Sequence, residues 1–179
     1  MSPVPLEGYI GGRERGRRMA KKRVYVESTI PSYLTANPPV NDIIKLAKQQ
    51  LTKKWWKQRG RWDLFISPVV LEEISDGDSE AAEKRIEASR GLFVLEEHPA
   101  ARALAEKLKA EVPIPEKARA DAAHLAFAAL YKMDFLLTWN QTHLGNPVLA
   151  EKAYKIIREK GLSPAVILTP EVLMEIKDD

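Results

Sequence analysis

Val24-Tyr25-Val26 is a short apolar run that ends abruptly in the polar triplet Glu27-Ser28-Thr29. The residues of the run are β-branched or aromatic and do not alternate with polar ones, so we expect a strand buried on both faces. Strands of that kind are typical of parallel sheets that helices cover on each side. The run therefore predicts a strand whose carboxyl end presents a carboxylate and two hydroxyl groups.

Four further apolar runs of this kind follow along the chain, at residues 64–66, 92–95, 135–138 and 165–168. Longer stretches with helical periodicity separate them. Residues 40–59 are expected to bury one apolar stripe, made of Ile43, Ile44, Ala47, Leu51 and Trp55. Residues 100–110 carry a similar stripe, made of Ala101, Leu104 and Leu108.

Helix boundaries are marked by capping residues, prolines and glycines. A cap followed by proline is typical of a helix start, and three such pairs occur, Ser67-Pro68, Asn146-Pro147 and Thr169-Pro170. Glycine is typical of a helix end, and the matching residues are Gly77, Gly91 and Gly161. Strands and helices that alternate in this way predict right-handed crossovers and an α/β fold.

The predicted fold class is a three-layer α/β/α sandwich with a mostly parallel central sheet. A chain of 179 residues has the length of one domain. No internal repeat or linker interrupts the pattern, so we expect a single domain over residues 23–179. A basic, flexible tail over residues 1–22 is expected to precede it.

Composition excludes several classes of protein. The chain is 45% hydrophobic and 30% charged, unlike a disordered chain, and it has no apolar run long enough to cross a membrane. It contains no cysteine, which excludes a disulfide scaffold, a zinc finger and a cysteine nucleophile. The absence of cysteine fits a reducing cytoplasm, which is the location we expect.

The positive charge lies in the tail rather than over the fold. The whole chain carries +3 and has a sequence pI near 9.0, but residues 1–23 alone carry seven basic and two acidic residues. Residues 24–179 therefore carry −2. The tail could bind phosphates, but we expect residues 1–18 to be dispensable for stability and activity.

Polar residues that follow the strands are the candidates for a site, because ligands of open α/β sheets bind beyond the carboxyl ends of the strands. After the first run come Glu27, Ser28 and Thr29; after the others come Glu72-Glu73, Asp121 with His124, and Thr138-Trp139-Asn140. Their oxygen atoms suit Mg²⁺ or Mn²⁺. Such a cluster is compatible with a nuclease, a phosphatase or a metal-dependent switch domain; no predicted strand ends in the aspartate that a phosphate-transfer switch requires.

Four segments carry a resemblance to a known family. They are residues 24–33, 66–74, 121–126 and 136–144, and they resemble, in order and spacing, the motifs of PIN-domain proteins, more narrowly the toxin-like VapC-type branch. The resemblance covers residues 22–175. It implies a PIN-like fold and a Mg²⁺- or Mn²⁺-dependent endoribonuclease, a hydrolase that forms a homodimer and pairs with a small antitoxin protein in a type II toxin–antitoxin system.

The resemblance also implies roles for individual residues. Glu27, Glu73 and Asp121 match the family's metal-binding acids, with Glu73 preferred to its neighbour Glu72, and Asn140 falls where many relatives have a fourth acid. Contacts with the RNA substrate are expected from Ser28, Thr29, Thr138 and His124. His143 is a weaker candidate.

Two departures from the family pattern leave a second hypothesis open. Most relatives have aspartate where this chain has Glu27, and Asn140 lacks the charge of an acid. The alternative is therefore a catalytically weak PIN-like domain that binds RNA or a protein partner. Basic and aromatic residues interleave at residues 53–62, where Trp56 is a candidate for stacking on RNA bases and Trp55 is expected in the core.

Overall fold

The five predicted strands all form, and they make one parallel sheet. The computed structural model describes residues 20–113 and 119–177, so the predicted tail lies almost wholly outside the described residues. The strands are β1 (Arg23–Val26), β2 (Asp63–Ile66), β3 (Phe93–Val94), β4 (Phe135–Leu137) and β5 (Val166–Leu168). Their order is β3-β2-β1-β4-β5, and every neighbouring pair is parallel. The sheet that the sequence predicts as mostly parallel is thus parallel throughout.

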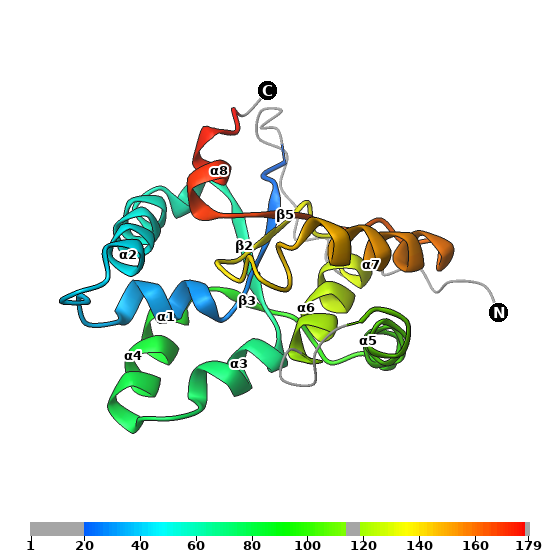
Figure 1. Ribbon diagram of the computed structural model, residues 1–179, viewed down its shortest axis with the longest axis horizontal. Coiled ribbons are helices and arrows are strands. Elements are labelled where there is room, and N and C mark those ends of the chain that lie inside the picture. The colour runs from blue at the N-terminus through cyan, green and yellow to red at the C-terminus, as the bar shows by residue number, and fades with distance from the viewer. Residues whose placement is uncertain (1–19, 114–118, 178–179) are drawn as a thin grey trace, which may run out of the picture.

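Helices cover both faces of the sheet. The helices of the described residues are α1 (Thr29–Thr35), α2 (Ile43–Trp56), α3 (Pro68–Ser75), α4 (Ser79–Ser89), α5 (Pro99–Glu111), α6 (Arg119–Leu130), α7 (Pro147–Glu159) and α8 (Pro170–Glu175), with a 3-10 turn at Arg59–Arg61. Figure 1 shows α2 and α8 on one side of the strands and α5, α6 and α7 on the other. The predicted three-layer α/β/α sandwich is confirmed.

The predicted helix boundaries are also confirmed. Ser67, Asn146 and Thr169 each accept a hydrogen bond from a backbone N–H of the helix that follows, and each precedes a proline at the first position. Gly77 and Gly91 follow the ends of α3 and α4 with φ of 86°, a left-handed conformation in which other residues are strained. Short-range signals are therefore sufficient to set where these helices begin and end.

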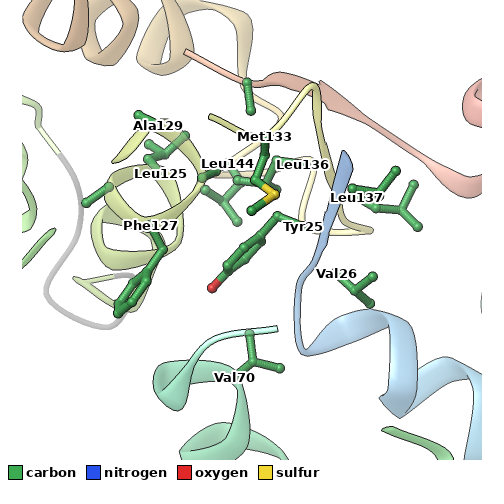
Figure 2. Close-up of a cluster of buried hydrophobic side chains, with 14 of the residues drawn as sticks. Tyr25, Val26, Val70, Leu125, Phe127, Ala129, Met133, Leu136, Leu137 and Leu144 are labelled. Carbon is green, nitrogen blue, oxygen red and sulfur yellow. The ribbon is translucent and has the colours of Figure 1, made fainter. Parts of the chain in front are cut away.

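Burial of the strands depends on their place in the sheet. Every apolar side chain of the central strand β1 is 0% exposed, and Figure 2 shows Tyr25 and Val26 on opposite sides of it. The edge strands differ, because Val94 of β3 is 55% exposed and Val166 of β5 is 52% exposed. The expectation that all five strands are buried on both faces is therefore wrong at the two edges, where a strand has a neighbour on one side only.

The apolar stripe predicted for residues 40–59 is wrong in its first turns. Ile43 is 82% exposed and Ile44 is 68% exposed, while Gln49 and Thr52 are buried beside Trp55. Hydrogen bonds hold these inward side chains: Gln49 Nε2 donates to the carbonyl of Ala36 at 2.6 Å, and Thr52 Oγ1 accepts from the indole of Trp139 at 2.8 Å. Gln49 Oε1 is buried without a partner among the described residues. Buried polar groups with partners thus set the inner face of α2.

The aromatic residues of the segment 53–62 lie mainly in the protein interior. Trp55 is fully buried, as predicted, and its ring stacks on that of Trp62 with centroids 6.0 Å apart. Trp56 is partly buried against the core, and the guanidinium of Arg59 lies over its ring at 4.8 Å. Stacking of an RNA base on Trp56 would therefore compete with the guanidinium of Arg59, and this role stays a prediction.

Among the residues that the structure describes, no helix is long and apolar enough to span a bilayer.

Candidate metal and catalytic site

The candidate site lies where β1 and β4 end side by side. These two strands are neighbours at the centre of the sheet although β1 opens the fold and β4 follows about 110 residues later, so the direction of winding reverses between them. Glu27 continues directly from β1, and its backbone N–H donates to the carbonyl of Leu137 at 3.1 Å. Open α/β sheets bind their ligands at such a reversal point.

Glu27 is a buried carboxylate held by hydroxyl groups. Only 3% of the residue is exposed. Its Oε2 accepts hydrogen bonds from the backbone N–H and the hydroxyl of Thr29, at 3.1 and 2.5 Å, and from the hydroxyl of Thr138 at 2.7 Å. Its Oε1 accepts from the hydroxyl of Ser28 at 2.8 Å. Oε2 is thus fully engaged, whereas Oε1 has capacity for a further ligand.

The three hydroxyl residues expected to contact substrate therefore position Glu27. Thr29 and Thr138 also accept hydrogen bonds from the loop after β4, from the backbone N–H of Trp139 at 2.9 Å and of Asn140 at 2.8 Å. Each hydroxyl links a carboxylate on one strand to the backbone that follows the other. These hydroxyl groups therefore hold the Glu27 carboxylate and the segments after β1 and β4 in fixed positions relative to one another.

Glu73 and His124 meet next to Glu27. Glu73 lies on α3 and His124 on α6, and Glu73 Oε2 and His124 Nε2 are 3.1 Å apart, without the alignment of a hydrogen bond. Burial opposes ionisation of Glu73, but the neighbouring His124 outweighs it and holds the pKa of Glu73 below its ordinary value. Burial likewise opposes charging of His124, yet the carboxylates of Glu73, Glu27 and Asp121 raise its pKa.

The neighbouring residue Glu72 does not belong to this group. Its side chain is exposed, whereas Glu73 is partly buried and faces His124. Successive residues of a helix point about 100° apart, so only one of the pair turns toward the sheet. The preference for Glu73 over Glu72 agrees with this orientation.

Asp121 and Asn140 form a second pair at the site. Asp121 is 7% exposed, and its Oδ1 accepts a hydrogen bond from Nδ2 of Asn140 at 3.0 Å. The pKa of Asp121 is raised to about 6, mainly by burial and further by the charge of Glu27, against the lowering effect of His124, His143 and Asn140. Asn140 Oδ1 accepts from the backbone N–H of His143 at 3.2 Å, so both ends of its amide are in use.

Two residues that the sequence did not single out complete the site. The hydroxyl of Tyr25 lies 2.8 Å from His124 Nδ1 and 2.7 Å from Ser67 Oγ, and all three residues are buried. Burial raises the pKa of Tyr25 well above its ordinary value, so the phenol stays protonated. A tyrosine in a buried aliphatic strand needs a hydrogen-bond partner for its hydroxyl. That requirement was the signal in the sequence that could have pointed to Tyr25 as a site residue.

The atoms available to a metal come from three elements. One atom each of Glu27, Glu73 and His124 lie within 4.8 Å of one another, and Asp121 is not in this group. Among the described residues, five buried side-chain nitrogen or oxygen atoms have no hydrogen-bond partner, and three of them, Glu73 Oε2, His124 Nε2 and Asp121 Oδ2, belong to the candidate site. Such atoms are rare in folded proteins; the other two, Gln49 Oε1 and Trp55 Nε1, lie on α2. The side chains present therefore fit a divalent cation held by oxygen and nitrogen.

Cavities coincide with the site only in part. A cavity of about 300 Å³ lies between α1 and α4 and is lined by Lys84 and Arg85 among others, but by none of the predicted site residues. A small one of about 10 Å³ borders Asp121 and His143. Lys84 pairs with Glu80 at 2.6 Å, so part of the positive charge at the larger cavity is neutralised.

Comparison with known proteins gives a likeness of fold only. No family model matches the sequence, and no curated protein matches it. Among solved structures, the chain is similar to one chain in the crystal structure of VapBC2 from Rickettsia felis bound to a DNA fragment from their promoter. The TM-score is 0.49 at 13% sequence identity, over 82% of this chain and 98% of that chain. At these values the likeness carries no statement about activity, metal or partner.

Proposed function

We propose that this protein is a metal-dependent endoribonuclease that hydrolyses RNA phosphodiester bonds. The observation that carries the proposal is the meeting of Glu27, Glu73 and His124 at the reversal point of the sheet, with buried polar atoms that have no protein partner. Asp121 lies close enough for Glu27 to raise its pKa. Repulsion among such carboxylates is relieved by a bound cation, which is a general feature of hydrolytic metal sites.

The residues of the candidate site have different roles in the proposed function. Glu27, Glu73 and Asp121 would hold Mg²⁺ or Mn²⁺, and the ion when bound would activate a water and offset charge on the phosphodiester. Ser28, Thr29 and Thr138 keep the Glu27 carboxylate in place. Asn140 orients Asp121 through its amide. An aspartate at position 140 would instead put a second negative charge beside Asp121.

The choice of RNA and the partners rest on the resemblance of the sequence motifs to VapC-type PIN proteins. The proposed biological role is that of the toxin of a type II toxin–antitoxin pair in the cytoplasm, with a small antitoxin protein as partner and a homodimer as the active form. Residues 24–179 carry a net charge of only −2, so in this proposal the bound ion attracts RNA more than the net charge of the domain does.

RNA cleavage with and without metal tests the enzymatic part of the proposal. The purified protein is incubated with structured and single-stranded RNA in the presence of Mg²⁺, Mn²⁺ or a chelator. We expect cleavage only with metal, and a fall of more than about 100-fold in Asp121→Asn and in Glu73→Gln, because each removes a charged ligand.

Glu72→Gln is the matched control for Glu73→Gln. It makes the same chemical change one residue away, on the exposed side of α3, and is expected to cleave like the wild type. Equal rates for wild type and Asp121→Asn would count against the proposal, because cleavage would then come from a contaminating nuclease or from another site.

A second candidate function is an RNA- or protein-binding module with weak catalysis. The observation that favours it is Asn140, whose amide is occupied on both sides and adds no charge for a second metal. This function predicts that wild type and Asp121→Asn bind RNA equally and that neither cleaves it. The same set of reactions, with an RNA-binding measurement added, separates the two candidates.

A further inference from the structure

A buried row of polar groups leads from the sheet to His124. Ser67 Oγ, the Tyr25 hydroxyl and His124 Nδ1 are joined at 2.7 and 2.8 Å. Figure 2 shows Tyr25 reaching from β1 into the space between α6 and the start of α3, where Val70 lies. Ser67 Oγ also accepts from the backbone N–H of Val70 at 3.4 Å, which ties the row to the first turn of α3.

The hydroxyl row allows two hydrogen-bond arrangements, which differ in the nitrogen of His124 that carries a hydrogen. Tyr25 has a single hydroxyl hydrogen and two partners, so it can donate to only one of them. When it donates to Ser67 Oγ, it accepts from Nδ1–H of His124, and Nε2 is left with its lone pair. Metal-binding histidines are commonly held in this way, with the second ring nitrogen donating to an oxygen.

The position of Nε2 suits a metal ligand better than a hydrogen bond. His124 is 0% exposed, and its Nε2 has no hydrogen-bond partner among the described residues. Glu73 Oε2 lies 3.1 Å away, outside hydrogen-bond alignment. Two adjacent ligands that are each about 2.1 Å from an octahedral ion lie ~3.0 Å apart, which is the separation found here.

We propose that His124 Nε2 is a metal ligand together with Glu27 and Glu73, and that this nitrogen makes the site prefer Mn²⁺ to Mg²⁺. Tyr25 and Ser67 are then positioning residues that hold the imidazole with its lone pair toward the ion. Imidazole nitrogen favours transition metals, whereas Mg²⁺ favours oxygen. The inference rests on the metal site of the proposed function, but not on its nuclease activity.

Electron paramagnetic resonance of the Mn²⁺-loaded protein tests the ligand directly. Coordination by an imidazole produces a nitrogen coupling in the pulsed spectrum, and we expect one in the wild-type protein. Titration calorimetry should give a tighter Kd for Mn²⁺ than for Mg²⁺, by about tenfold or more. A wild-type spectrum without nitrogen coupling would overturn the proposal without any variant being made.

The three histidines of the chain provide matched controls. His124→Gln is expected to lose the nitrogen coupling and most of the preference for Mn²⁺, because an amide oxygen replaces the nitrogen. His98→Asn retains a capping side chain at the start of α5, far from these ligands in the sequence, and should keep both properties. If the coupling persists in His124→Gln and is lost in His143→Gln, the nitrogen ligand is His143, and the proposal is refuted.

Tyr25→Phe tests the positioning row and does not depend on His124→Gln folding. It removes one oxygen and keeps the ring, so the nitrogen coupling should persist while the affinity for Mn²⁺ falls about 10- to 100-fold. A purely structural role for Tyr25 would lower the free energy of unfolding and leave Mn²⁺ affinity unchanged.

These measurements fail independently of the proposed function. A protein that shows nitrogen coupling and binds Mn²⁺ but cleaves no RNA would support His124 as a ligand and refute the nuclease. Cleavage of RNA with Mg²⁺ by a protein whose Mn²⁺ form shows no nitrogen coupling would support the nuclease and refute His124 as a ligand.

Discussion

The side chain of Glu27 is one methylene longer than the aspartate that most PIN-domain proteins have at the matching position. The hydroxyl groups around Glu27 lie where the longer side chain can reach them. Thr138 directly follows β4, and its hydroxyl reaches Glu27 Oε2 at 2.7 Å where β1 and β4 end. Thr29 contacts the same oxygen from the other side. The longer side chain is thus built into the site rather than displaced from it.

Glu27→Asp is therefore expected to weaken the site. A carboxylate drawn back by one methylene leaves the buried hydroxyls without an acceptor, which costs about 1–3 kcal/mol in the free energy of unfolding. Metal-dependent RNA cleavage should fall as well. Chemical denaturation and the cleavage assay measure the two effects, with the exposed Glu151→Asp as control. A faster rate in Glu27→Asp would show that the hydroxyls do not set the reach of the carboxylate.

Asp121 makes the metal-free protein less stable at neutral pH. Its pKa is about 6 in the fold, mainly because of burial, against an ordinary value of 3.8. Between these two values the folded state binds a proton that the unfolded state does not, so the contribution of Asp121 to stability decreases as pH rises from about 4 to about 6 and stays low above that range.

Asp121→Asn is accordingly expected to stabilise the metal-free protein near pH 7.5, by about 2 kcal/mol, while the gain disappears near pH 4. Urea denaturation at several pH values in a chelator measures this difference. Mn²⁺ should stabilise the wild type more than the variant, because ligand binding to the folded state adds stability. A variant less stable than wild type at pH 7.5 would contradict the pKa assignment.

At the scale of the elements, the N-cap residue of α3 both begins the helix and contacts the site. Ser67 caps the helix through the backbone N–H of Val70, and the same oxygen contacts the hydroxyl of Tyr25. Glu73 lies further along the same helix and faces His124. The start of α3 thus fixes both the carboxylate and the hydroxyl row that reaches the histidine.

Ser67→Ala should therefore affect stability and metal binding together. Loss of a helix cap costs about 1 kcal/mol, and the Tyr25 hydroxyl loses a partner in addition. Thr169→Ala removes the cap of α8, which accepts from Val172, and should cost stability alone. Thermal unfolding and Mn²⁺ titration of the two variants distinguish the effects. Equal Mn²⁺ affinity in the two variants would show that Ser67 caps α3 without affecting the metal site.

Sequence patterns predict where strands and helices lie better than they predict which face of a helix is buried. Apolar runs were sufficient for all five strands, because strands at the centre of a parallel sheet need apolar residues throughout. The inner face of α2 could not be predicted, because Gln49 and Thr52 are buried by virtue of partners that lie elsewhere in the chain. Tyr25 was missed as a site residue for the same reason, since its partners are 42 and 99 residues away.

At the scale of the whole molecule, the order of strands brings the candidate residues together. Acidic residues after different strands can be read from the sequence, but their meeting point depends on β1 lying between β2 and β4. The pairing of Asp121 with Asn140, beside the group of Glu27, Glu73 and His124, depends on side-chain directions that no spacing encodes. The sequence therefore supplied the candidates and the fold supplied their arrangement.

Removing residues 1–18 is expected to leave the folded domain unchanged. The first strand begins at Arg23, and Asp134 anchors its start by accepting from the backbone N–H of Arg23 at 2.8 Å. The truncated and full-length proteins should have the same melting temperature and the same metal-dependent cleavage. A large fall in either quantity would give the basic segment a role in the fold or in RNA binding.

The central strand β1 precedes the other four described strands along the chain, and this has a consequence for the time at which the site is formed. Glu27 leaves the ribosome 111 residues before Thr138, whose hydroxyl holds its carboxylate. At ~5–20 residues per second, roughly 5–20 s separate the two. A chain that is released early, before β4, carries Glu27 and Glu73 but no assembled centre. Chains that end before β4 therefore lack the Thr138 contact that holds the Glu27 carboxylate.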